Sequence, residues 1–311
     1  MVNHSSQNNC GLLPLTFVTQ ELGVRLLMAS LGMKLPVIVR AVGAGIFLGV
    51  AGTVPWAYLV KLNLKFHPNI PWSVAPMILY LILFWKFAQG KTWPPSTSET
   101  RKKNLRAKAL TSEAWGAALL AGILGLISLG FFQAVYNQLV RLPQQQLGDV
   151  RNLSTGTIFL LLIMGSVVAG VVEESSFRGY MQQPIEKRHG PVIAILITGI
   201  LFGLAHFSHP ETTLALMPFY FYVAVVYGML AYLSRSILPG IVMHIGGDVW
   251  VGIILLLSGQ SEWATSTKPS PLIWETGPNA SFWISCFLFI ISFAAAVWAY
   301  VSLKHVADKT S

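Results

Sequence analysis

Three acidic side chains and two histidines lie inside long apolar stretches of this sequence, where charged groups are unexpected. They are two glutamates, two histidines and one aspartate: Glu173, Glu174, His206, His244 and Asp248. A charged side chain at the centre of a bilayer costs at least about 2.5–3.5 kcal/mol, even on the most lenient scale. Such residues usually face a bundle interior or a wet cavity, and they mark a functional site. We therefore expect the chemistry of the protein to reside in these five residues.

The two adjacent glutamates have different surroundings on a helix. Glu174 and Arg178 are four residues apart and share a helix face. This spacing predicts an internal ion pair that makes both charges tolerable. Glu173 lies about 100° around the helix from Glu174, so it has no such partner nearby. We expect Glu173 to point into a cavity, where a carboxylate can act as a general base.

The same i, i+4 spacing relates Phe202 to His206, and His244 to Asp248. A histidine can orient a water molecule or shuttle a proton, and an imidazole donor can stabilise a developing oxyanion. An ionised aspartate only accepts hydrogen bonds, so Asp248 would orient His244 or act while protonated. The two histidines with Glu173 or Asp248 would also make a two-histidine, one-carboxylate zinc site, and this alternative stays open.

Eight apolar stretches can position these residues, each near the roughly 20 residues that cross a bilayer as a helix. They are 36–60, 71–90, 114–140, 156–181, 191–209, 213–234, 237–258 and 281–303. The five ionisable residues fall in the fourth, fifth and seventh stretches. The sequence thus predicts an all-α, polytopic membrane protein of about eight transmembrane helices, with an intramembrane cavity between those three.

The domain organisation follows from the same pattern. Residues 1–35 are predicted to form an N-terminal interfacial segment, with an amphipathic helix at 12–33. Residues 36–311 are predicted to form a single transmembrane domain, and its chemistry-bearing core covers about 155–260.

The composition agrees with a membrane protein. Hydrophobic residues make up 54% of the chain and charged residues only 11%, against about 25% charged in soluble domains. Most basic residues fall in segments that are cytoplasmic if both termini are inside, so we predict an integral protein of the plasma (inner) membrane in that orientation. The basic loop 101–108 is interpreted as an orientation signal that touches anionic head groups. This clustering does not indicate nucleic-acid binding.

Three short motifs, on successive apolar stretches, contain the ionisable residues. They are EExxxR at 173–178 (EESSFR), FxxxH at 202–206 (FGLAH) and HxxxN/D at 244–248 (HIGGD). In this order they resemble the CPBP family, which comprises type II CAAX prenyl endopeptidases and the bacteriocin-processing and abortive-infection proteins. The resemblance covers roughly residues 155–260.

The resemblance implies an intramembrane, glutamate-dependent endopeptidase that needs no cofactor and cleaves a membrane-associated or lipidated peptide or protein. It implies that Glu173 with His206 activates a water molecule, and that His244 and Asp248 stabilise the oxyanion. Phe202 and the Glu174–Arg178 pair would support the site structurally. Asp248 stands where asparagine is expected more often.

Two other functions are compatible with the same residues. One is a zinc-dependent membrane metalloprotease that uses His206 and His244 and is sensitive to chelators. The other is a non-catalytic transporter, immunity protein or scaffold whose buried charges serve a proton path or helix packing. The aromatic run 219–222 (FYFY) is interpreted as a lipid- or helix-packing surface that could instead line a cavity for a lipidated substrate.

Overall fold

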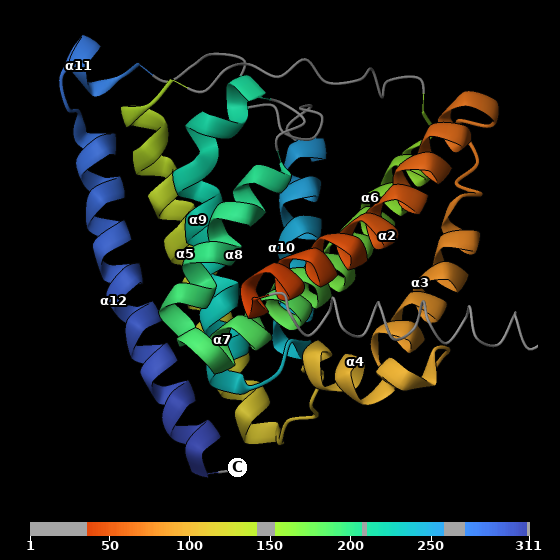
Figure 1. The fold of residues 1–311 in the computed structure, drawn as a ribbon. Helices are drawn as coiled ribbons and strands as arrows, with labels where there is room; N and C mark the ends of the chain where they lie inside the picture. Colours follow the sequence, from red (N-terminus) through yellow and green to blue (C-terminus); the bar gives the residue numbers. More distant parts are fainter. Residues whose placement is uncertain (1–35, 142–152, 207–209, 258–270, 310–311) are drawn as a thin grey trace, which may run out of the picture.

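The computed structural model describes residues 36–141, 153–206, 210–257 and 271–309 of the 311-residue chain. Helices and connecting turns make up these ranges, and they contain no β-strand. The all-α prediction is therefore confirmed (Figure 1). The predicted interfacial helix at 12–33 lies outside the described residues.

One main helix lies in each of the eight predicted apolar stretches. These helices are α2 (Val37–Phe66), α3 (Val74–Ala88), α5 (Ser112–Leu139), α6 (Thr155–Glu173), α8 (Pro191–Ala205), α9 (Pro210–Ser234), α10 (Leu238–Leu257) and α12 (Ala280–Lys309). Shorter elements connect them: η1 (Pro95–Thr97), α4 (Ser98–Leu105), η2 (Glu174–Gln182), α7 (Gln183–His189) and α11 (Ile273–Thr276).

Five helices in the described ranges are long and apolar enough to cross a membrane, and three apolar helices are shorter. Both α3 and α8 have 15 residues. At 1.5 Å per residue such a helix reaches only about 22 Å, less than the roughly 30 Å of a hydrocarbon core. The long apolar helices agree with a membrane protein, while the count of eight spans stays a prediction.

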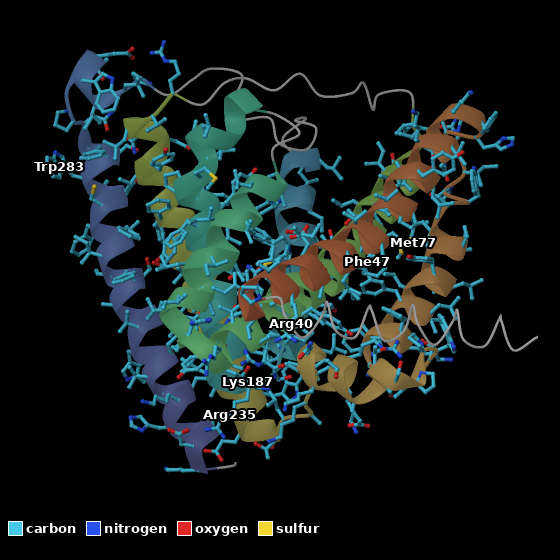
Figure 2. The ribbon with its side chains drawn as sticks, in the orientation of Figure 1. Arg40, Phe47, Met77, Lys187, Arg235 and Trp283 are labelled. Atoms are coloured by element: carbon cyan, nitrogen blue, oxygen red, sulfur yellow. The ribbon has the colours of Figure 1, made fainter. Side chains whose placement is uncertain are left out.

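Glycines let α2 and α6 approach closely. A Cβ atom at Gly52 of α2 would lie 2.4 Å from Val172 of α6, and one at Gly45 would lie 2.8 Å from Met181 of η2. Small residues at a helix interface bring the backbones together. As a result α2 and α6 run side by side, tilted across the bundle, as Figure 1 shows. On the outer surface, Phe47 of α2 and Trp283 of α12 are both exposed, and Figure 2 shows Trp283 at the outer edge of the molecule.

Two arginines of the basic loop 101–108 are buried, while its lysines are exposed, and its interpretation as an orientation signal stays a prediction. Arg101 donates to the carbonyl oxygens of Phe87 at 2.7 Å and Pro94 at 2.9 Å. Arg106 forms a buried ion pair with Glu186 of α7. These two arginines fasten the loop to the bundle, because a buried guanidinium needs acceptors. Figure 1 places α4, α7 and the C-terminus at the same end of the molecule.

Candidate active site

The EExxxR motif lies across a change of helix type. Glu173 is the last residue of α6, and Glu174 is the first of the π-helix η2. Segments of π-helix are rare and frequently occur at functional sites. The hydroxyl of Ser176 donates to the carbonyl oxygen of Val172 at 2.7 Å, and such back-bonding often bends a helix. The sequence pattern predicted an uninterrupted α-helix here, so the local geometry of the motif differs from that expectation.

Glu174 is the buried centre of the cluster, and its side chain is fully inaccessible. Its Oε1 lies 3.5 Å from Nη1 of Arg178, so the predicted ion pair is present. The same oxygen lies 3.0 Å from Nδ1 of His244, which donates to it. A Cβ atom at Gly240 would lie only 2.9 Å from Oε2 of Glu174. Glu174 thus joins η2 to α10 as well as to its own helix.

The other ring nitrogen of His244 faces two more carboxylates. Its Nε2 lies 3.8 Å from Oε2 of Glu173 and 3.7 Å from Oδ2 of Asp248. Side-chain exposure separates the three acids: 0% for Glu174, 24% for Glu173 and 43% for Asp248. The side chain of Glu173 is therefore partly accessible, whereas that of Glu174 is fully enclosed by the protein. The arrangement gives adjacent glutamates different environments, as their helical spacing suggested.

His206 lies just beyond the end of α8, with φ −89° and ψ 13°. Its Nδ1 lies 2.8 Å from the carbonyl oxygen of Phe202. Because a carbonyl oxygen only accepts, Nδ1 is the donor in this bond. The Phe202 ring also contacts the Arg178 guanidinium at 4.8 Å. Phe202 therefore connects His206 to the ion pair of the first motif.

Two tyrosines of α9 lie flat against the two histidines. The rings of Tyr220 and His206 stack with centroids 4.4 Å apart and planes at 22°. The rings of Tyr227 and His244 stack at 5.0 Å and 20°. The sequence interpretation placed residues 219–222 on a packing surface and did not consider Tyr227. The seven-residue separation of the tyrosines, which puts both on one helix face, is the signal that could have indicated them.

The predicted site residues thus come together in two groups. Glu173, Glu174 and Asp248 surround His244 directly. His206 lies in a second group with the rings of Tyr220 and Phe202, and Phe202 in turn contacts Arg178.

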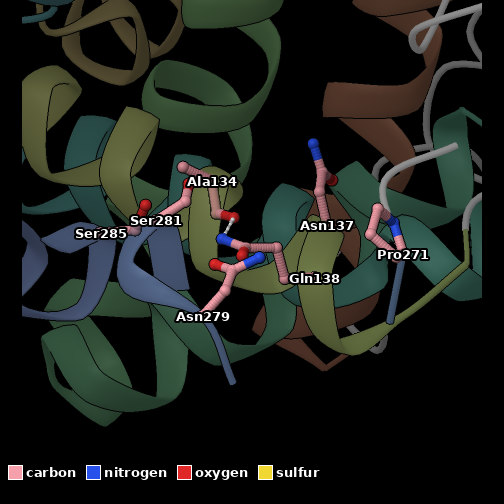
Figure 3. Close-up of a pocket in the computed structure, with 7 residues that line it drawn as sticks. All are labelled: Ala134, Asn137, Gln138, Pro271, Asn279, Ser281 and Ser285. Atoms are coloured by element: carbon pink, nitrogen blue, oxygen red, sulfur yellow. Dashed lines mark hydrogen bonds between the residues drawn. The ribbon is translucent and has the colours of Figure 1, made fainter. Parts of the chain in front are cut away.

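The predicted intramembrane cavity stays a prediction. A cavity of about 390 Å³ lies elsewhere, between the end of α5 and the beginning of α12 (Figure 3). Its lining is neutral and contains none of the motif residues: Ala134, Asn137, Gln138, Pro271, Asn279, Ser281 and Ser285. This cavity is not where the ionisable residues gather.

The sequence also allowed a zinc site formed by His206, His244 and a carboxylate. Within the described ranges, no three His, Cys, Asp or Glu side chains form a group suited to holding a metal ion. The zinc alternative therefore stays a prediction, and we derive no step of the reaction through zinc.

Comparison with known proteins supports the resemblance seen in the sequence. Residues 155–250 match the family described as type II CAAX prenyl endopeptidase Rce1-like, and this range contains all three motifs. No curated protein and no solved structure matches the chain. The match confirms the CPBP resemblance for the motif-bearing part of the chain, and the long apolar helices indicate an integral membrane protein.

Proposed function

We propose that this chain, whose residues 155–250 carry the signature of a CAAX-type protease family, is a glutamate-dependent intramembrane endopeptidase. Its substrate would be a membrane-associated or lipidated peptide or protein. The observation that carries the proposal is the position of His244 between the enclosed Glu174 and the partly accessible Glu173. One carboxylate can orient the ring, while the other remains open to a water molecule and a substrate.

In the proposed reaction Glu173 acts as the general base. Its carboxylate takes a proton from a water molecule, which His206 helps to orient, while the water oxygen bonds to the scissile carbonyl carbon. The carbon–nitrogen bond of the tetrahedral intermediate then breaks, and Glu173 returns the proton to the leaving amine. Glu173 ends each cycle as a carboxylate.

His244 is proposed to stabilise the oxyanion. Because Nδ1 donates to Glu174, only Nε2 of the ring points toward the open part of the site. A protonated ring donates Nε2–H to the developing negative charge, and a fixed donor needs no reorganisation during the reaction. Glu174 would keep the ring in this orientation, and Arg178 would balance the charge of Glu174.

Asp248 is proposed to act from the rim of the site. Its side chain is the most exposed of the three acids, and its Oδ2 lies near the same Nε2 of His244. It would orient the imidazole or contact substrate.

The direct test is cleavage of quenched fluorescent peptides, including prenylated ones, by the full chain in liposomes. Loss of a general base lowers the rate by about 10²–10⁴-fold, so we expect such a loss in Glu173→Gln. The control is Glu113→Gln, at the exposed first turn of α5, which should cleave at the wild-type rate. Full activity in Glu173→Gln would overturn the assignment.

The same assay separates the two protease mechanisms. Activity that survives a strong chelator supports the glutamate mechanism. Activity that is lost on chelation and restored by added zinc would replace it with the metalloprotease alternative.

A further inference from the structure

We propose that Tyr220 and Tyr227 of α9 are positioning residues that fix the planes of the two site histidines. The helix that carries them contains none of the three motifs. The inference rests on the proposed function for its catalytic consequence, while the ring arrangement itself can be tested without any substrate.

The geometry of the two contacts is alike. In each, a tyrosine face covers an imidazole face, with interplanar angles of 22° for Tyr220–His206 and 20° for Tyr227–His244. Both tyrosines are buried, with exposures of 7% and 3%. Seven residues separate them, which is about two turns or 10.5 Å along one helix face. One face of α9 therefore supports both imidazoles.

A hydrogen bond at Nδ1 does not by itself fix the plane of an imidazole ring. The Nδ1 bond of His244 to Glu174 fixes one edge of the ring but not its tilt about that bond. The Nδ1 bond of His206 to the Phe202 carbonyl does the same, and His206 has already left the helical backbone of α8. A flat ring against one face restricts the tilt and leaves the nitrogen edges open to reactants.

Tyr227 can restrict the His244 ring because hydrogen bonds fix the backbone on either side of it. The hydroxyl of Tyr300 on α12 donates to the carbonyl oxygen of Val226 at 2.9 Å. The side-chain amide of Gln182 on η2 donates to the carbonyl oxygen of Gly228 at 2.9 Å. These bonds flank Tyr227 and connect it to the same π-helix that carries Glu174. The guanidinium of Arg178 also lies 5.4 Å from the Tyr227 ring.

Tyr220 is held by aromatic packing and by the start of its helix. Its ring contacts Phe202 at 6.2 Å and Phe219 at 5.8 Å. The hydroxyl of Tyr136 on α5 donates to the carbonyl oxygen of Ala215 at 2.6 Å, which fastens the preceding turns of α9.

The kinetic test compares substitutions that keep the ring with substitutions that remove it. We expect Tyr227→Leu and Tyr220→Leu to lower kcat by about 10- to 100-fold, because a displacement of about 1 Å in a catalytic group has effects of that size. The KM should stay within about twofold, since neither tyrosine is assigned to substrate binding. The Phe variants keep the ring face and should restore kcat to within about threefold of wild type.

The matched control is Tyr222→Leu on the same helix. Tyr222 contacts Phe132 edge-on at 5.1 Å and hydrogen-bonds with Ser128 at 2.7 Å, so it supports packing and no imidazole. Its loss should leave kcat unchanged. If a Leu variant fails to fold, the Met variant refills the volume with a flexible chain that presents no ring face, and it should show the same loss of kcat.

The second readout needs no activity. In protein labelled at histidine and reconstituted in lipid, a stacked aromatic face shifts the imidazole C–H resonances upfield. His206→Gln and His244→Gln assign the two signals. We expect the upfield shift of His244 to persist in Tyr227→Phe and to disappear in Tyr227→Leu and Tyr227→Met, with the same pattern for His206 and Tyr220.

Distinct outcomes overturn the two proposals. Unchanged resonances and an unchanged kcat in the Leu and Met variants overturn the positioning role. Phe variants as impaired as the Leu variants also overturn it, because the hydroxyl and not the ring face would then be required. If wild type cleaves no peptide, the proposed function fails, while the resonance shifts still decide whether the tyrosines hold the rings.

Discussion

His244 lies in the middle of α10 among three carboxylates, whereas His206 lies just past the end of α8 with its ring against a tyrosine face. The first ring is held by a charged hydrogen bond, with an aromatic contact in support. The second is held by a backbone carbonyl and by aromatic packing. Charge therefore dominates one half of the site and packing the other, and the two halves should respond differently to substitution.

Arg178 lies between the two halves, so its replacement should have the largest effect. It pairs with the buried Glu174 and contacts the rings of Phe202 and Tyr227. Removing one partner of a buried ion pair costs about 3–5 kcal/mol, and we expect Arg178→Met to lose that much stability. Arg235→Met is the control, because its pair with Asp308 is exposed and worth about 0–1 kcal/mol.

The measurement for this first prediction is thermal unfolding in micelles, followed by tryptophan fluorescence. Equal losses in Arg178→Met and Arg235→Met would mean that the buried pair does not support the charged half.

The two histidines themselves give the next comparison. His244→Ala removes a hydrogen bond to a buried carboxylate and an aromatic contact, together worth about 2–4 kcal/mol. His206→Ala removes a neutral hydrogen bond to a backbone carbonyl and the aromatic contacts of a partly exposed ring, together worth about 1–2 kcal/mol. Both variants should lose peptidase activity, but only His244→Ala should also unfold at a clearly lower temperature. A larger loss of stability in His206→Ala would reverse the distinction between charge and packing.

Substitution of Gly240 tests how closely the residues around Glu174 are packed. The added methyl of Gly240→Ala would lie 2.9 Å from Oε2 of Glu174, whose other oxygen is held by His244 and Arg178. We expect the displaced carboxylate to lower kcat by about 10- to 100-fold. Gly246→Ala on the same helix is the matched control, because its methyl meets no atom within 4 Å.

The control should keep full activity and gain up to about 1 kcal/mol from the better helix propensity of alanine. If Gly240→Ala cleaves peptides at the wild-type rate, the position of Glu174 is less constrained than the packing indicates.

The sequence predicted the contacts between residues close in the chain better than the contacts between residues far apart in the chain. The Glu174–Arg178 pair and the proximity of His244 to Asp248 follow from i, i+4 spacing, and both are present. The bond between Glu174 and His244 joins residues 70 positions apart, so it depends on how η2 packs against α10. Helical periodicity carries no information about that register.

The tyrosine supports and the π-helix were missed for related reasons. Tyr220 and Tyr227 gain their role only when α9 packs beside both histidines, and a lone aromatic at helical spacing usually indicates packing. The π-helix packs against the basic loop, where a Cβ atom at Gly179 would lie 3.1 Å from the Leu105 carbonyl oxygen, and helical periodicity does not indicate such long-range packing. The burial of Arg101 and Arg106 was missed because basic loop residues were assigned to lipid head groups.

Among the substitutions near His244, Asp248→Asn should have the smallest effect on peptidase activity. Its side chain is 43% exposed and lies 3.7 Å from His244 Nε2, so its charge is screened by water. Asp248→Asn keeps the shape and supplies an amide donor that can face an oxyanion, so kcat/KM should stay within about threefold of wild type or exceed it. Asp308→Asn, near the C-terminus, is the exposed control. A 100-fold loss of kcat/KM in Asp248→Asn alone would mean that the negative charge of Asp248 takes part in the reaction, and His244 would then depend on two carboxylates rather than on Glu174.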